Sequence, residues 1–390
     1  MAFCLKRQQK DDEACMNILY AFDDLFAEVA GISILSLFEN NKDADEINVY
    51  AICDGVSDIN KQRLITLSED YGRKIIFLDA PDVEKIAGTA IKIQDNYTLC
   101  AISSFYRLFI SSILPPDMKK IIYIDSDTTI HGSLSELWNM EQGGNIVSGV
   151  RHFKPKAYIN QQTFLKRRDL YINAGVMLIN LDLWRFYDVE AKFIKFIMLM
   201  DGKILFYDQG VLNTVLKGYI GCIDRTWNYV EMVQRKKFFV PRKVWDFKVQ
   251  WRENPVIRHY LQIRYRIDDA EKSGENSSWI RKHWYKWREM SPWRGLPLEH
   301  LRSPRPQSAE HTANPKRKTI RSSILHFTEK NCKPLYSLLS RLGIYLKAFL
   351  RRIKRFFREA VTEPLRIRKY NKHRQKVTGI NIKDCRITTL

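Results

Sequence analysis

Ile121-Ile122-Tyr123-Ile124-Asp125-Ser126-Asp127 is the stretch that decides the fold. Four apolar residues of this kind predict a short buried strand, and ligands of α/β proteins gather where such strands end. In extended backbone, residues two apart point to the same side, so Asp125 and Asp127 can share one hard divalent cation such as Mn²⁺ or Mg²⁺. The competing interpretation is an ordinary Asp-rich turn after a strand.

Alternating strands and helices surround this stretch. The apolar runs 17–22, 47–52 and 74–78 predict strands, and the periodic segments 27–39 and 57–71 predict helices. Further along the chain we expect a buried helix over 98–113 that Pro115 stops, strands ending near 150 and 181, and helices from about 182 and 206. This order predicts an α/β fold with a doubly wound sheet.

The composition narrows the class of protein. With 390 residues and 45% hydrophobic residues, the chain can build one large domain with extensions or two modest ones. It contains no apolar run of 18 residues, and its first residues lack the apolar segment of a secretory signal. Seven scattered cysteines without a Cys-x-x-Cys pair favour a reducing compartment over disulfides or a zinc site.

Most of the positive charge lies at the C-terminal end. Residues 315–390 hold 21 Lys and Arg against 4 Asp and Glu, which is a net +17 of the total +20. We expect a polar lead-in over 1–15, a catalytic domain over 16–293, a Pro-rich linker over 294–325 and a basic tail over 326–390.

The tail carries an amphipathic helical pattern from Pro334 to Ala360, with basic residues beside an apolar face. Such a helix can lie in the interface of an anionic membrane, and we expect residues 334–376 to do so. Packing on the catalytic domain or dimerisation would use the same apolar face. Nucleic acid is not expected as a partner, because that face would then have no use.

Several ordered segments resemble glycosyltransferase family 8, the retaining enzymes that include bacterial lipopolysaccharide galactosyl- and glucosyltransferases and glycogenin. The resemblance covers residues 17–293 approximately. The segments that carry it are Met16–Asp24, Ser104-Phe105-Tyr106-Arg107-Leu108, Tyr123–Asp127, Gly132-Ser133-Leu134 with Leu137-Trp138, Asn173-Ala174-Gly175-Val176, Tyr207-Asp208-Gln209 and Trp227-Asn228.

The resemblance implies a GT-A (nucleotide-diphosphosugar transferase) fold with a Rossmann-like mixed sheet. It also implies a UDP-galactose or UDP-glucose donor, Mn²⁺ or alternatively Mg²⁺, and a lipopolysaccharide or other glycan acceptor. The enzyme would then work in the cytoplasm, peripherally on the inner face of the cell membrane. The residues that the resemblance assigns are Asp125, Asp127 and His259 to the metal, Asp208 and Gln209 to catalysis, and Ala21, Phe22, Asp23, Asp24, Phe26, Arg107, Asp125, Ser126, Asn173 and Ala174 to the donor.

The chain departs from the family pattern at two places. After His259 it lacks the family's glycine and Lys-Pro-Trp, so Arg264, Lys272 or Lys282 would have to bind the diphosphate. Leu25 stands where the family has asparagine.

Retention of configuration has two routes here: front-face attack, with Gln209 steadying the sugar, or double displacement through Asp208. Two other functions stay open. Asp125-x-Asp127-x-Thr129 formally fits a haloacid-dehalogenase-like phosphatase, with Asp268-Asp269 as its later acidic pair, and the altered diphosphate region is consistent with a non-catalytic, transferase-derived binding protein.

Overall fold

The structure is a computed structural model that describes residues 15–91, 102–152, 164–165, 169–204, 206–230, 255–261, 263, 281–298 and 363–387. Contacts divide the chain into two compact units, Met1–Ser303 with Arg374–Leu390, and Pro304–His373. Of the second unit the structure describes residues 363–373, which are the first part of helix α15 (Glu363–Thr378).

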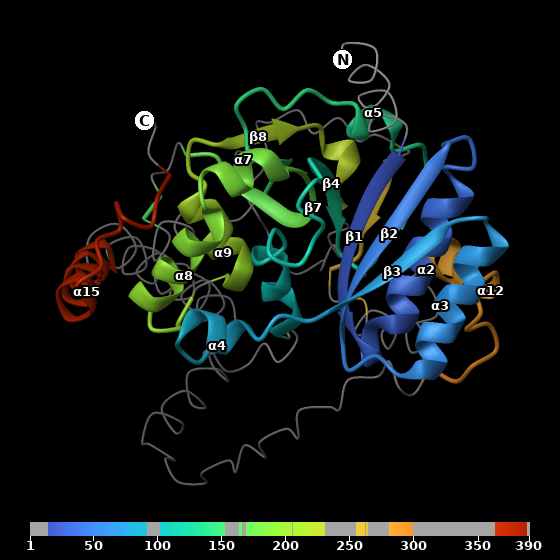
Figure 1. Ribbon diagram of the computed structural model, residues 1–390, viewed down its shortest axis with the longest axis horizontal. Coiled ribbons are helices and arrows are strands. Elements are labelled where there is room, and N and C mark those ends of the chain that lie inside the picture. Colours follow the sequence, from blue (N-terminus) through green and yellow to red (C-terminus); the bar gives the residue numbers. More distant parts are fainter. Residues whose placement is uncertain are drawn as a thin grey trace, which may run out of the picture. The chain divides into compact units, whose positions relative to one another are not determined.

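A seven-stranded mixed sheet forms the centre of the first unit, in the order β3-β2-β1-β4-β7-β6-β8 (Figure 1). β7 runs antiparallel to both of its neighbours, and the other pairs are parallel. The strands are β1 (Cys15–Asp23), β2 (Glu46–Asp54), β3 (Lys74–Asp79), β4 (Lys120–Ile124), β6 (Val147–Arg151), β7 (Ile172–Asn180) and β8 (Ile220–Ile223).

Each face of the sheet is covered by its own apolar cluster. Along β1, Ile18, Tyr20 and Phe22 belong to one cluster and Leu19 to the other, because alternate residues of a strand point to opposite faces. Helices α2 and α3 gather on one side of β1–β3, and α7, α8 and α9 belong to the other half of the unit (Figure 1). The helices are α2 (Ala27–Glu39), α3 (Asp58–Asp70), α4 (Val83–Ala87), α5 (Ser135–Trp138), α7 (Leu181–Phe186), α8 (Val189–Leu199), α9 (Tyr207–Val215) and α12 (Lys286–Glu289), with 3-10 helices η1 (Asp24–Phe26), η2 (Ile102–Leu108) and η3 (Arg225–Trp227) and a π-helix η5 (Arg281–Tyr285).

This architecture confirms the predicted α/β fold with a mixed central sheet, and the predicted strands and most helices lie within a few residues of the observed ones. The predicted helix over 98–113 is right for residues 102–108, although these form a 3-10 helix, and wrong for residues 109–113. Residues 102–108 form the 3-10 helix η2, and the backbone N–H groups of Ser111 and Ser112 donate to Glu190 Oε1 at 2.7 and 3.3 Å. Those donors are used by a distant carboxylate, so the segment is not continued as an α-helix.

A second, three-stranded sheet forms beyond the end of β4. Its order is β5 (Thr128–Ile130), β10 (Ile257–His259), β9 (Tyr229–Val230). Because β5 follows β4 after three residues, this sheet carries residues far apart in the sequence to the carboxyl end of the central sheet.

The end of the predicted basic tail packs on the first unit. Cys385 and Ile387 are buried in the second apolar cluster, Arg374 Nη2 lies 2.9 Å from Asp201 Oδ2, and Arg386 Nη2 donates to the Phe164 carbonyl at 2.9 Å. Of the predicted linker the structure describes residues 294–298, where Leu296 and Leu298 pack against the first apolar cluster. The rest of the predicted linker and the predicted helix over 334–360 lie outside the described residues. Among the helices that are described, none has both the length and the apolar character that a membrane crossing requires.

Candidate active site

The loop Asp125–Asp127 is a turn between β4 and β5, not the extended segment that the sequence suggested. Its backbone is held on both sides: Asp125 N donates to the Gly175 carbonyl at 2.7 Å, and Tyr260 N donates to the Asp127 carbonyl at 2.8 Å. Both aspartates nevertheless face one place. The reason is the turn between two sheets, rather than the alternation of a single strand.

His259 completes a cluster of three metal-ligating side chains. Its Nε2 lies 3.1 Å from Asp127 Oδ1 and 3.7 Å from Asp125 Oδ2, and the three ligand atoms lie within 4.8 Å of one another. The ring is 1% exposed, and Nε2 is buried without a hydrogen-bond partner among the described residues. Two carboxylates and an imidazole form a donor set that fits Mn²⁺ or a similar divalent cation.

The surroundings of this cluster favour positive charge. Burial by itself would lower the pKa of His259, but the Asp127 and Asp125 carboxylates outweigh it and raise the pKa above its usual value. There is also no room for a larger residue at Gly175, where a Cβ atom would lie 2.3 Å from His259 Cε1 and 2.7 Å from Asp125 Oδ2. The glycine therefore keeps open the space beside the three ligands.

Arg107 is buried and ties the metal cluster to Asp208. Its Nη2 lies 2.8 Å from Asp125 Oδ1, its Nε lies 3.2 Å from Asp208 Oδ2, and its Nη1 donates to the Ala174 carbonyl at 2.8 Å. The guanidinium also stacks 4.3 Å from the centre of the Tyr123 ring. Its 6% exposure excludes an ion pair on the protein surface as the role of this residue.

Asp208 lies in the first turn of α9 and is buried. Burial raises the pKa of its carboxyl to about 6, although Arg107 partly offsets this. The two preceding residues, Phe206 and Tyr207, have left-handed φ values of 65° and 52°. Residues other than glycine seldom adopt this conformation, which concentrates at functional sites, and here it directs the chain into α9.

Asn173 and Gln209 lie together beside Asp208. Asn173 Nδ2 donates to Gln209 Oε1 at 3.1 Å, and Ala174 N donates to the same oxygen at 3.2 Å. Two residues outside the predicted set join them: Gln209 Nε2 donates to the hydroxyl of Tyr171 at 3.2 Å, and Asn228 Nδ2 donates to Asn173 Oδ1 at 2.8 Å. Tyr171 could have been found from its place directly before β7 and two residues before Asn173, and Asn228 from the Trp227-Asn228 segment.

The predicted donor residues at the end of the first strand, here called the first-strand loop, lie in the last three residues of β1 and in η1. They lie next to Ser126, whose hydroxyl donates to the Ala21 carbonyl at 3.5 Å. Phe22 is 1% exposed and points into the first apolar cluster, against which Phe26 also packs. Asp23 Oδ1 accepts from Phe26 N at 3.0 Å.

Asp24 has a visible structural role. Its Oδ1 accepts from Ser57 N and from Asn60 Nδ2, both at 2.8 Å, and so joins the first-strand loop to the start of α3. Arg264, Lys272 and the pair Asp268-Asp269 lie outside the described residues, and of Lys282 only the backbone is described.

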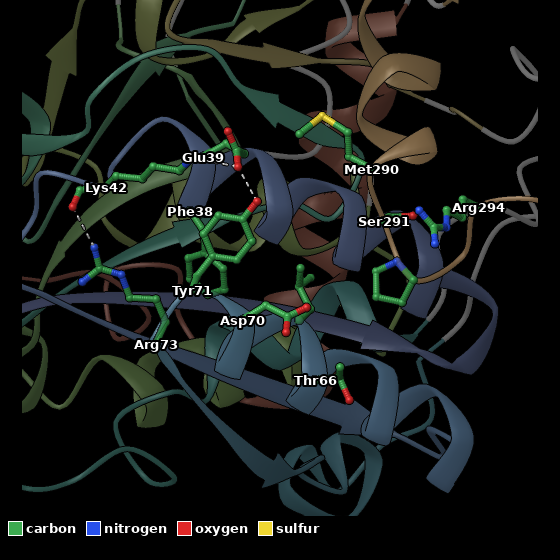
Figure 2. A pocket seen from close by; sticks show the side chains of 12 residues that line it. Phe38, Glu39, Lys42, Thr66, Asp70, Tyr71, Arg73, Met290, Ser291 and Arg294 are labelled. Atoms are coloured by element: carbon green, nitrogen blue, oxygen red, sulfur yellow. Dashed lines mark hydrogen bonds and ion pairs between the residues drawn. The ribbon is translucent and has the colours of Figure 1, made fainter.

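A pocket of about 770 Å³ lies elsewhere, between α2, α3 and residues 290–294 (Figure 2). Its polar side chains pair with one another: the Tyr71 hydroxyl donates to Glu39, and Lys42 Nζ lies 3.0 Å from Glu39 Oε1. None of the predicted site residues lines it. The carboxylate cluster at the end of β4 therefore remains the candidate active site.

Comparisons with known proteins agree with this geometry. Residues 17–263 match glycosyl transferase family 8. A protein of Haemophilus influenzae is 29% identical over 218 residues, which cover 55% of this chain and 63% of that protein. The lipopolysaccharide 1,3-galactosyltransferase of Salmonella typhimurium is 25% identical over 283 residues, which cover 66% and 80% of the two chains.

Among solved structures, the galactosyltransferase LgtC in complex with donor and acceptor sugar analogues superimposes with a TM-score of 0.59 at 21% identity. The match covers 73% of this chain and all of that one. This likeness shows a shared GT-A fold. The match of residues 17–263, which is more than half of the chain, establishes that this chain belongs to glycosyl transferase family 8.

Proposed function

We propose that this protein is a retaining, metal-dependent hexosyltransferase that moves galactose or glucose from a UDP-sugar to a glycan or glycolipid acceptor such as lipopolysaccharide core. The observation that carries the proposal is the group of two half-buried aspartates, Asp125 and Asp127, and the buried His259 at the carboxyl end of the sheet, with His259 Nε2 lacking a hydrogen-bond partner among the described residues. The lipopolysaccharide galactosyltransferase among the relatives supports the choice of acceptor class.

In this proposal the three ligands hold Mn²⁺ or Mg²⁺, which when bound neutralises the charge of the departing diphosphate. Arg107, Asn173, Ala174 and Asp208 surround the donor sugar. The first-strand loop and Ser126 contact the nucleotide, with residues Ala21, Phe22, Asp23, Asp24 and Phe26.

We favour front-face transfer, in which the leaving phosphate oxygen takes the proton of the acceptor hydroxyl and Gln209 steadies the cationic sugar. Asp208 is poorly available for double displacement, because its Oδ2 is held by Arg107 Nε at 3.2 Å. Mass spectrometry of enzyme quenched during turnover decides the point. A hexose attached covalently to Asp208 would establish double displacement instead.

A screen of UDP-sugars for hydrolysis in the presence of Mn²⁺ tests the function directly. We expect one UDP-hexose to be turned over, and Asp125→Asn to reduce that turnover by at least roughly 100-fold, since it removes a charged metal ligand. Asp70→Asn, an exposed aspartate at the end of α3, is the matched control and should leave turnover unchanged.

Other outcomes of the screen point to other functions. Absence of any UDP binding would favour a non-catalytic binding protein. A phosphoenzyme trapped with a metal fluoride, without UDP-sugar turnover, would favour the phosphatase.

We also propose that residues 334–376 bind an anionic membrane on the cytoplasmic face of the cell membrane. The support is the net +17 of residues 315–390, since each basic residue near an anionic surface contributes about 1 kcal/mol. Truncation is a poor test, because it would remove Cys385 and Ile387 from the second apolar cluster.

Substitution of Arg351, Arg352, Lys354, Arg355 and Arg358 by Gln avoids this. It should abolish co-sedimentation with vesicles that contain phosphatidylglycerol. The matched control replaces five exposed lysines of the first unit by Gln and should still sediment: Lys74, Lys85, Lys195, Lys203 and Lys286. Equal sedimentation of both variants would overturn the membrane assignment.

A further inference from the structure

A continuous series of hydrogen bonds joins His259 to Gln209 through two buried asparagines. His259 Nδ1 lies 2.9 Å from Asn228 Oδ1, Asn228 Nδ2 lies 2.8 Å from Asn173 Oδ1, and Asn173 Nδ2 lies 3.1 Å from Gln209 Oε1. Asn228 and Asn173 are 1% and 7% exposed. The series therefore links a candidate metal ligand to a candidate sugar-contacting residue with little access for water.

The direction of these hydrogen bonds is set by two backbone N–H groups. Gly175 N donates to Asn173 Oδ1 at 2.9 Å, and Ala174 N donates to Gln209 Oε1 at 3.2 Å. A backbone N–H is only a donor, so the atom that faces it has to be the amide oxygen. This chemical argument assigns the orientations of both amides, which heavy-atom positions alone leave ambiguous.

The orientation of the Asn173 amide determines which ring nitrogen of His259 carries the hydrogen. Because Asn173 presents its oxygen, Asn228 has to present its NH₂ group to it and its own oxygen to His259. That oxygen can only accept, so the hydrogen of the neutral imidazole is on Nδ1. The lone pair is then on Nε2, the atom that lies 3.1 Å from Asp127 Oδ1 without a hydrogen-bond partner among the described residues.

We propose that Asn228 is a positioning residue that holds His259 in the Nδ1–H tautomer with Nε2 ready to bind a cation, and that the same hydrogen-bond series couples the metal site to the amide of Gln209. The inference rests on the proposed metal-dependent function. It adds a residue that touches neither the cation nor the donor, and it gives the metal site and the sugar site a shared structural element. Partners of metal-ligating histidines commonly act in this way.

Two substitutions of Asn228 separate the two halves of the proposal. Asn228→Ala removes both contacts. Asn228→Asp keeps an oxygen acceptor for His259 Nδ1, but it places a second acceptor against Asn173 Oδ1 and so breaks the link to Gln209. Asn41→Ala is the matched control for losing a buried asparagine. Asn41 is 0% exposed, and its Oδ1 accepts from Leu134 N at 2.7 Å in a part of the fold outside the site.

The primary measurement is the Mn²⁺ dissociation constant of the full chain without donor, by electron paramagnetic resonance. We expect Asn228→Ala to weaken Mn²⁺ binding about 10- to 100-fold, Asn228→Asp to stay within about threefold of wild type, and Asn41→Ala to match wild type. Asn228→Asp should still lower kcat for UDP-sugar hydrolysis about tenfold, because Gln209 loses its support.

A second measurement reads the tautomer directly. In ¹⁵N-histidine-labelled, metal-free protein at pH 8.5, the His259 signals are assigned by their loss in His259→Gln. We expect a protonated Nδ1 and an unprotonated Nε2 in wild type and in Asn228→Asp, and a mixture of tautomers in Asn228→Ala. This readout would not move if Asn228 only stabilised the fold.

The inference is overturned if Asn228→Ala keeps both the wild-type Mn²⁺ affinity and the wild-type tautomer, or if Asn228→Asp weakens Mn²⁺ binding as strongly as alanine does. Asp125→Asn is measured in parallel. If it loses Mn²⁺ while Asn228→Ala keeps it, only the role of Asn228 is wrong. If Asp125→Asn also binds Mn²⁺ like wild type, the proposed metal site itself is wrong.

Discussion

Two buried arginines, Arg107 and Arg288, differ in the number of carboxylates that surround them. Both are almost equally buried, at 6% and 5% exposure. Arg288 Nε pairs with Glu28 Oε1 at 2.6 Å, and its Nη2 donates to the Leu296 carbonyl at 2.6 Å. One positive charge therefore meets one negative charge, and the pair joins α12 to α2.

The site around Arg107 is not balanced in this way. Arg107 contacts Asp125 and Asp208, and Asp127 lies beside Asp125 against His259. Three carboxylates thus share one guanidinium, and with a neutral imidazole the group carries an excess of negative charge. A balanced buried pair stabilises the fold, whereas an excess of negative charge on half-buried carboxylates creates a place for a cation.

The largest effect on metal binding and turnover is expected when one methyl group is added beside the carboxylates that surround Arg107. In Gly175→Ala the new Cβ would lie 2.3 Å from His259 Cε1, so His259 and Asp125 have to move apart. We expect Mn²⁺ affinity and UDP-sugar turnover to fall at least roughly 100-fold, because a small displacement of ligands costs much of the binding. Gly144→Ala is the control, since a Cβ there meets nothing within 4 Å. Wild-type Mn²⁺ binding by Gly175→Ala would contradict the assignment of the metal site to Asp125, Asp127 and His259.

Arg288→Met breaks the balanced pair and should act on stability alone. We expect the free energy of unfolding to fall by about 3–5 kcal/mol, because Glu28 is left as a buried charge. Urea unfolding measures this, and turnover per folded molecule should not change. The double variant Glu28→Leu with Arg288→Met should recover part of the loss. A loss of turnover at unchanged stability would place Arg288 in the site instead.

Gly31→Ala changes the packing of α2 in the region of the Arg288–Glu28 pair. A Cβ at this position of α2 would lie 2.3 Å from Trp293 Cζ3, and Trp293 is 1% exposed. We expect a loss of about 1–3 kcal/mol from displacement of the indole, without a change in Mn²⁺ affinity. The contrast with Gly175→Ala is informative, because at both positions an added Cβ would lie 2.3 Å from an atom of a buried ring. Only the ring at Gly175 belongs to the metal cluster.

The smallest expected effect is a pH dependence near the balanced pair. His131 contacts His283 and Trp287 edge-on, and burial, followed by the charge of His283, lowers the pKa of His131 to about 3. The unfolded chain, with a pKa near 6.5, binds this proton at a higher pH than the folded protein does. Stability is therefore lost as pH falls below about 6.5.

His131→Phe should remove this part of the acid sensitivity. Between pH 7 and pH 5 we expect the variant to lose about 1–2 kcal/mol less than wild type in urea unfolding. An identical loss in both proteins would show that His131 does not titrate on unfolding.

Much of the fold could be predicted from local patterns. The alternation of β1 and the apolar run of β4 are properties of neighbouring residues, so periodicity alone placed these strands. The helix expected over 98–113 ends early, at Leu108, and beyond it Glu190, almost eighty residues away, accepts from the backbone N–H groups of Ser111 and Ser112. No local pattern contains that partner.

Part of the candidate site could likewise be predicted from the sequence, and part could not. The sequence by itself determined that Asp125 and Asp127 follow a buried strand, and the resemblance to the family pointed to His259, Arg107, Asp208 and Gln209. Only the tertiary structure decided that these side chains meet. β7 inserted antiparallel beside β4 brings Gly175 and Asn173 to the aspartates, and β10 paired with β5 brings His259.

The role inferred for Asn228 belongs wholly to the tertiary structure. The direction of its hydrogen bonds depends on the backbone donors of Ala174 and Gly175 on another strand. The physical reason is general: the period of a strand or helix is encoded by adjacent residues, whereas strand pairing and hydrogen-bond direction depend on residues that come together only when the chain folds.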